Sequence, residues 1–297
     1  MDERNLVPPP PGGDYLPPPP PPSYPVTSDI PPSSAYHYSP APVGRPSKGL
    51  LGGLAALALG AFAYGKYALL LIFKVPALLT LGSALVSVAA YSLLAGPWVA
   101  VGLVLMIFVH EMGHVVEIRR QGMQATAPIF IPFLGAAIFQ RSHAQSPMRQ
   151  AQIGIAGPIA GTIGATVALA LYGSTHSVVL LIWAYYGFLI NLFNLIPFGM
   201  LDGGWILAPV SKWIQVAGLA VLAGLFLAGL VSPLVIIIVI LGLPVVYQRF
   251  RNPAHDAYLT SGPAAPRYAM GAAWLALVVY LAFFFFQTDS MLHHFVR

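Results

Sequence analysis

The sequence predicts an all-α polytopic membrane protein with about 6–8 transmembrane helices and a re-entrant loop or hairpin near a histidine motif. Three observations carry this prediction. The 297-residue chain is 57% hydrophobic and only 8% charged, a composition outside the range of soluble globular domains. Its apolar residues form runs that approach the ~20 residues needed to cross a bilayer. Its Lys and Arg residues gather at the ends of these runs, where membrane proteins place them.

The N-terminal segment, residues 1–47, differs from the rest of the chain in composition. It holds most of the prolines, including PPPP at 8–11 and PPPPPP at 17–22. Such a segment cannot form a packed core, which predicts a disordered proline-rich tail with polyproline II character. The tail would act as a solvated tether or as the ligand of a proline-binding module, and tethers are the more common case. Residues 48–297 are then the membrane-embedded domain, with its core at about 75–250.

Seven apolar runs are the expected spans: 75–95, 97–118, 151–172, 177–200, 213–231, 233–248 and 268–287. The run at 233–248 is short for a span. Residues 49–73 are also apolar, but Gly52-Gly53, Gly60 and Lys66 interrupt them. That pattern is compatible with an interfacial helix, a re-entrant hairpin or a pair of short spans.

The basic residues predict how the chain is oriented. If the seven spans alternate, every Lys and Arg from Arg45 to Arg267 falls on one side of the membrane, and Arg297 falls on the other. The positive-inside rule makes the basic side cytoplasmic, together with the N-terminus. Residues 49–73 must then begin and end on that side, which favours an interfacial or re-entrant element. The net charge of +5 is expected to face an anionic lipid surface rather than nucleic acid.

One motif, HEMGH at 110–114, predicts metal chemistry. Residues four apart lie on one face of a helix, so His110 and His114 can bind one metal ion while Glu111 acts on a water molecule beside it. With this composition, the pattern H-E-x-x-H is expected about 0.002 times by chance in the whole sequence. The chain has no cysteine, which leaves histidine and carboxylate as metal ligands. The alternative is that the two histidines form hydrogen bonds within a helix interface and bind no metal.

A third ligand is required, because a catalytic zinc ion usually has three protein ligands. Between residues 30 and 255 the acids are Glu111, Glu117 and Asp202, and an ionisable group inside a membrane domain is a functional candidate. Glu117 lies beside the arginines that end its run, which leaves Asp202. This residue follows a predicted helix break at 197–199, on the same side of the membrane as HEMGH. The alternative is that Asp202 only caps a helix starting at Gly203.

The segment at 127–140, APIFIPFLGAAIFQ, is too short to span the membrane. Pro128, Pro132 and Gly135 disfavour a helix there, and its branched and aromatic residues favour extended structure. We expect a hairpin or loop that dips into the membrane beside the metal, where protein or water covers its backbone. A packing role and a binding role are both compatible with this sequence.

HEMGH in one membrane helix, followed by NLIPFGMLDGG at 194–204 in a later one, resembles the site-2 protease family of intramembrane zinc metalloproteases. The second signature of that family, N-x-x-P-x-x-x-L-D-G, is matched at each fixed position: Asn194, Pro197, Leu201, Asp202 and Gly203. The segments IPFLGA at 131–136 and AGPIAG at 156–161 also look like family elements. The resemblance covers about residues 75–250, and it includes no insertion long enough for a PDZ module between the two motifs.

The resemblance implies one Zn²⁺ ion per chain, held by His110, His114 and Asp202, with Glu111 as the catalytic base. It also implies that Asn194 contacts the substrate or its oxyanion. A helix-packing hydrogen bond is the alternative role for Asn194, and Asn191 on the same face is a weaker candidate. Gly157 and Gly161, in small-x-x-x-small spacing, are expected to permit close helix packing.

The implied function is hydrolysis of peptide bonds in or near the transmembrane segments of single-span or other membrane-protein substrates, as in regulated intramembrane proteolysis. One alternative is a catalytically silent zinc-binding protein that recognises transmembrane helices; the intact Glu111 argues against it. A transporter that uses the same ligands for ion passage is a second alternative, although nothing in the spacing suggests an exit path.

Overall fold

The computed structural model describes Ser33 and residues 52–57, 59–60, 63–64, 76–141 and 144–296. The chain divides into two compact units, 1–61 and 62–297. The predicted proline-rich tail lies outside the described residues, apart from Ser33. The described residues between 52 and 64 are helical, but the assignment of 49–73 as an interfacial or re-entrant element stays a prediction.

The second unit is a helical bundle with one small hairpin. Each predicted span coincides with a helix. The elements are α2 (Pro76–Ala95), α3 (Pro97–Arg120), β1 (Ile129–Ile131), β2 (Gly135–Ala137), α4 (Pro147–Thr175), α5 (Val178–Asn194), α6 (Asp202–Leu207), α7 (Trp213–Leu227), α8 (Val235–Arg251), α9 (Pro253–Leu259) and α10 (Ala264–Val296).

The helix lengths make the predicted number of spans approximate. Among the described residues, the four helices α2, α3, α4 and α10 are long and apolar enough to cross a membrane. The pair α8 and α9, bent by 101°, is a fifth candidate, while α5 and α7 are shorter apolar helices. Many large apolar side chains point outward; Leu93, for example, is 87% exposed. Such a surface requires lipid around it, so the chain is an integral membrane protein.

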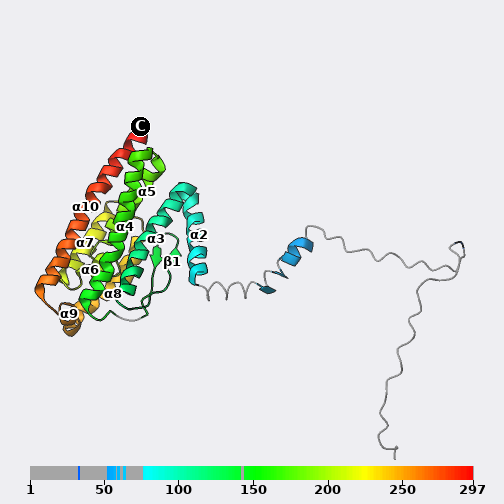
Figure 1. Ribbon diagram of the computed structural model, residues 1–297. Helices are drawn as coiled ribbons and strands as arrows, with labels where there is room; N and C mark the ends of the chain where they lie inside the picture. Colours follow the sequence, from blue (N-terminus) through cyan, green and yellow to red (C-terminus); the bar gives the residue numbers. More distant parts are fainter. Residues whose placement is uncertain are drawn as a thin grey trace, which may run out of the picture. The chain divides into compact units, whose positions relative to one another are not determined.

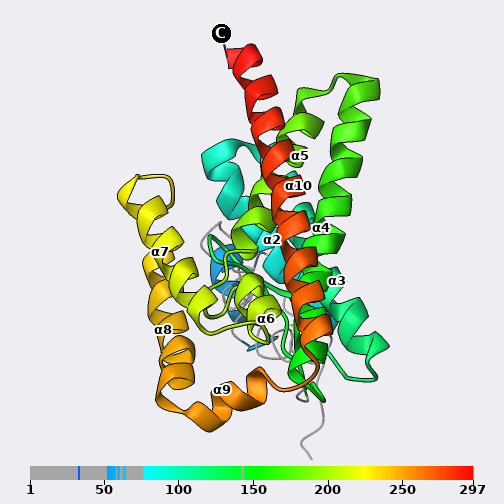
Figure 2. The same cartoon turned by 90° about the vertical axis from the view of Figure 1, so that its left-hand side faces the viewer.

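The helices around α4 form the centre of the bundle (Figure 1). Helix α4 packs against both α3 and α5, and α10 packs against α5 and the short helix α6. Figure 2 shows α7 and α8 side by side, with α9 leading from the end of α8 toward the start of α10. Fully buried apolar side chains fill the space between α5, α6 and α10; they include Phe188, Leu195, Ile206, Leu207 and Leu281. This core supports α6, the helix that begins at Asp202.

Local sequence signals fix where several helices begin. Pro147 occupies the first position of α4, where its missing N–H costs nothing, and Ser146 Oγ accepts a hydrogen bond from the Arg149 N–H at 3.2 Å. Gly96, with φ of +81°, turns the chain between α2 and α3. Helix α5 ends at Asn194 rather than at the predicted residue 200, because Pro197 cannot continue it.

The predicted hairpin at 127–140 is confirmed. Strands β1 and β2 pair antiparallel, with Phe130 opposite Ala136. Three hydrogen bonds tie the β1 side of the hairpin to α2: Thr80 Oγ1 donates to Pro128 O at 2.7 Å, Phe130 N–H donates to Ser83 Oγ at 3.1 Å, and Phe133 N–H donates to Tyr91 Oη at 2.9 Å. Helix α2 therefore occupies the outer edge of β1, whereas β2 lies on the other side of the hairpin.

Candidate metal centre

Helix α3 presents its two histidines on one face, as their spacing predicts. The Nε2 atoms of His110 and His114 lie 3.2 Å apart. His110 is 3% exposed, so the pair is directed into the bundle rather than toward lipid. The histidines alone do not complete a metal site, and the rest of the group comes from α6.

Asp202 reaches the histidines because the chain turns back after α5. Gly199 adopts φ of +50° in this turn, a backbone conformation that glycine tolerates best. The carboxylate oxygens of Asp202 lie 3.0 Å from His110 Nε2 and 3.3 Å from His114 Nε2. Helix α6 begins at Asp202 itself, and no side chain forms a cap hydrogen bond there. The alternative in which Asp202 only caps the helix is therefore wrong.

The other ring nitrogen of each histidine is held by an acceptor. His114 Nδ1 donates to the main-chain oxygen of Ile153 at 2.8 Å, and His110 Nδ1 donates to Asn191 Oδ1 at 2.8 Å. Asn191 is oriented by its own Nδ2, which donates to Gly187 O at 2.7 Å. Because the main-chain oxygen of Ile153 and the amide oxygen of Asn191 can only accept, these contacts place the proton of each neutral imidazole on Nδ1. The lone pairs of both Nε2 atoms then point toward Asp202.

This arrangement of donor atoms fits a metal ion. The ligand atoms of His110, His114 and Asp202 all lie within 4.8 Å of one another, so the three residues could hold one ion. With both Nδ1 atoms protonated, two imidazole lone pairs and a carboxylate face each other without a hydrogen to share. Asp202 Oδ2 is also buried without a hydrogen-bond partner among the described residues. A cation resolves both features, and the N₂O donor set suits zinc.

Glu111 lies beside this His-His-Asp group, on the wall of a cavity of about 370 Å³. It is 9% exposed, and His110 lines the same cavity. The tip of the hairpin, residues 133–136, forms another part of the wall. The predicted proximity of the hairpin to HEMGH is therefore confirmed, and a ligand in the cavity would lie between the hairpin and Glu111.

Asn194, the tentative substrate-binding residue, lines this cavity as well. Its Nδ2 donates to Ile190 O at 3.1 Å, within its own helix. That bond uses one of the two amide hydrogens, and the second remains for another acceptor. The role of Asn194 toward a substrate stays a prediction.

The role of Asn191 was not predicted from the sequence. It is 0% exposed, and its amide links α5 to His110. A signal was present in the sequence, because an asparagine inside a membrane helix must find a hydrogen-bond partner. What the sequence did not reveal is that this partner is a candidate metal ligand.

Gly157 and Gly161 of α4 permit close packing, as predicted, and the structure identifies what packs there. A Cβ atom on Gly157 would collide with the imidazole of His114, and one on Gly161 would collide with the amide of Asn191. The glycines therefore make room for the second histidine and for the residue that orients the first.

Asn191→Leu is expected to weaken zinc binding by about 10- to 100-fold, the range for residues that orient metal-bound histidines. The substitution keeps the size of the side chain but removes the acceptor for His110 Nδ1. Zinc affinity would be measured by competition with a chromophoric chelator in detergent. Asn194→Leu, about one turn further on, is the matched control, because the Asn194 amide donates to Ile190 O within its own helix. Equal affinities for the two variants would contradict the role assigned to Asn191.

The fold and the site define an integral membrane protein with a buried group of metal-ligating side chains. Residues 98–178 match the model of peptidase family M50, the family of the site-2 proteases. The matched segment contains HEMGH, the hairpin and α4, and it supports the resemblance inferred from HEMGH. The second motif, at 194–204, lies outside the matched residues. No curated protein matches the chain. The match supports a membrane metallopeptidase of the site-2 protease type.

Proposed function

We propose that the protein is a zinc metalloendopeptidase that cleaves peptide bonds in or near the transmembrane segments of other membrane proteins. The observation that carries the proposal is the convergence of His110, His114 and Asp202 inside the bundle, with Glu111 on the adjoining cavity. The match of residues 98–178 to peptidase family M50 supports it independently. One zinc ion per chain is proposed as the metal.

Each residue has a role that follows from its position. His110, His114 and Asp202 would hold the zinc ion, which when bound supplies Lewis acidity toward a water molecule and the peptide carbonyl. Glu111 accepts a proton from the attacking water and delivers it to the leaving amine as the carbon–nitrogen bond breaks. The free amide hydrogen of Asn194 would donate to the developing oxyanion, a contact worth about 3 kcal/mol in other hydrolases.

The proposal is tested with wild-type protein reconstituted in liposomes beside a panel of single-span membrane proteins. We expect close to one zinc per folded chain, cleavage that stops when a chelator removes zinc, and recovery when zinc is returned. The new termini should map within or next to the transmembrane segment. Folded wild type without zinc would refute the metal site. Zinc-loaded protein that leaves every substrate intact would support the catalytically silent alternative.

Strand addition to β2 is the proposed way of holding an unwound substrate. Because Phe130 N–H is directed to Ser83 and away from β2, Phe130 and Ala136 form a pair without hydrogen bonds between them. The N–H and C=O of Ala136 are then directed to the outer edge of β2. Ala136 also lines the cavity that contains Glu111. A substrate strand at this edge would place a peptide bond beside the His-His-Asp group.

Ala136→Pro is expected to reduce cleavage by at least about tenfold, because it removes a donor to the substrate strand and no bond of the hairpin itself. Zinc content should stay at the wild-type level. Ala136→Ser, which retains the N–H, is the control and should cleave like wild type. Cleavage by Ala136→Pro at the wild-type rate would rule out strand addition at this position.

The active-site side of the membrane is proposed to be cytoplasmic. Arg119 and Arg120 end α3, Arg249 and Arg251 end α8, and Arg267 lies near the start of α10, which agrees with the positive-inside rule. The chain has no cysteine, so a single cysteine introduced at the exposed Gln124 can report on sidedness in intact cells. If a membrane-impermeant maleimide added outside the cells labels that cysteine, the orientation is the opposite of the one proposed.

A further inference from the structure

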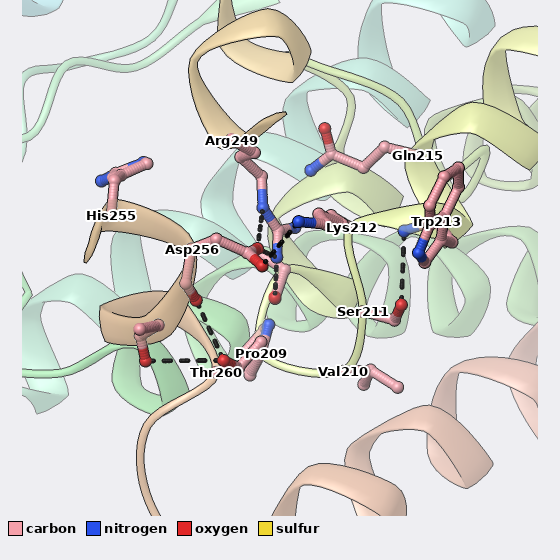
Figure 3. A network of polar contacts seen from close by, with 12 residues as sticks. Pro209, Val210, Ser211, Lys212, Trp213, Gln215, Arg249, His255, Asp256 and Thr260 are labelled. Atoms are coloured by element: carbon pink, nitrogen blue, oxygen red, sulfur yellow. Dashed lines mark hydrogen bonds and ion pairs between the residues drawn. The ribbon is translucent and has the colours of Figure 1, made fainter. Parts of the chain in front are cut away.

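A partly buried ion pair joins α8 to α9 (Figure 3). Arg249, in the last turn of α8, is 1% exposed. Its Nε and Nη2 donate to Oδ1 of Asp256, in the first turn of α9, at 3.1 and 2.7 Å. Lys212 Nζ lies 3.5 Å from the other carboxylate oxygen. The pair therefore fixes the geometry across the 101° bend between the two helices.

The same arginine also holds the end of α6. Arg249 Nη2 donates to the main-chain oxygen of Ala208, the residue that follows this helix, at 3.0 Å. Three further donors reach carbonyls of this region: Gln215 Nε2 to Gly204 O at 3.4 Å, Arg267 Nε to Pro209 O at 2.6 Å, and Arg267 Nη2 to Val210 O at 3.2 Å. The last carbonyls of a helix lack partners within it, and positive charge is favourable there. Side chains of α7, α8 and α10 supply both.

Helix α6 needs this support because of its length. With six residues from Asp202 to Leu207, it is too short to be stable by itself. At 1.5 Å per residue, Ala208 lies about 9 Å along the axis from Asp202. A displacement of the anchored end is transmitted along so short a helix to Asp202. Metal–ligand distances tolerate only about 0.2 Å of change.

We propose that Arg249 and Asp256 are positioning residues, which hold α6 where Asp202 can meet His110 and His114. The inference rests on the proposed function, since it concerns the same metal group. It adds to the proposed function that an ion pair between α8 and α9 holds the metal group in its geometry. Arg249 acts through Ala208 O, and Asp256 acts by fixing the guanidinium of Arg249.

A stabilising role alone would predict a different result. Replacing a buried ion pair by apolar side chains of similar volume is often neutral or stabilising for a fold. An apolar pair can fill the space between α8 and α9, but it cannot donate to Ala208 O. The double substitution Arg249→Met/Asp256→Leu therefore separates the stability of the bundle from the position of α6.

The test measures zinc affinity by chelator competition, together with the thermal midpoint of the metal-free protein, both in detergent. We expect Arg249→Met/Asp256→Leu to bind zinc about tenfold more weakly than wild type, with the metal-free midpoint unchanged. Asp256→Asn, which keeps the shape of the side chain, should lose affinity in the same direction. Arg251→Met, an exposed arginine of the same helix turn, is the matched control and should bind zinc like wild type.

A second comparison shows whether the effect passes through Asp202. In an Asp202→Asn background, the double substitution is expected to cause no further loss of zinc affinity. An additive loss of zinc affinity in that background would overturn the proposal. So would wild-type zinc affinity of Arg249→Met/Asp256→Leu, or a loss of affinity accompanied by a lower metal-free thermal midpoint. Wild-type protein without zinc would instead refute the proposed function, and this inference with it.

Discussion

Glu111→Gln is expected to lower peptide hydrolysis by about 10²- to 10⁴-fold, the contribution of a positioned general base. Glutamine keeps the size of the side chain on the wall of the 370 Å³ cavity, but its amide cannot accept the proton of the attacking water. Glu111 is not one of the three clustered ligands, so the variant should still hold one zinc per chain. Cleavage of a single-span substrate and zinc content, measured on one preparation, check both statements.

Glu117→Gln is the matched control for this prediction. Glu117 lies on the same helix and carries the same group, but its carboxylate accepts hydrogen bonds from Arg120 Nε at 2.6 Å and from Gln121 Nε2 at 2.8 Å. Removing its charge breaks an ion pair with the exposed Arg120 at the end of α3, and such surface pairs contribute little to stability. We expect wild-type cleavage from Glu117→Gln. If Glu111→Gln still cleaves the substrate, Glu111 is not the general base, and the assignment of the zinc ligands is unaffected.

The parts of the site that the sequence predicted are those with a local cause. The face shared by His110 and His114 follows from helical periodicity, which needs no knowledge of the neighbouring helices. The hairpin follows from prolines and β-branched residues within one short segment. The break before Asp202 follows from Pro197. In each case the residues that determine the feature lie within a few positions of one another.

The parts that the sequence did not predict depend on which helices pack together. Asn191 orients His110, and Ile153 O orients His114, only because α4 and α5 both lie against α3. The contact between Arg249 and Ala208 O likewise joins residues 41 positions apart. Such partners follow from tertiary packing and not from periodicity. The number of spans was approximate because α5 and α7, with 17 and 15 residues, are shorter than the apolar runs that contain them.

Asp202→Asn is expected to weaken zinc binding by at least about 100-fold. This is the upper end of the range seen when a residue that only hydrogen-bonds to a metal ligand is replaced. The variant keeps the shape of the side chain but replaces the charged ligand by a neutral amide. His110 Nε2 lies 3.0 Å from Oδ2 of Asp202 and His114 Nε2 lies 3.3 Å from Oδ1, so the NH₂ group that replaces one of these oxygens can donate to one of the two Nε2 atoms. The amide thus occupies one of the lone pairs that the metal needs. Chelator competition gives the affinity.

The metal-free Asp202→Asn variant is expected to lose no stability, which separates loss of a metal ligand from loss of the fold. The introduced NH₂ group would satisfy one of the two histidine lone pairs, and the amide removes the buried charge that opposes the other, so the thermal midpoint without zinc should equal or exceed that of wild type. Asp289→Asn, an exposed acid of α10 paired with His293 at 3.5 Å, is the control and should bind zinc like wild type. If Asp202→Asn binds zinc with wild-type affinity, α6 does not supply the third ligand. If its metal-free thermal midpoint falls below that of wild type, Asp202 acts by stabilising the fold.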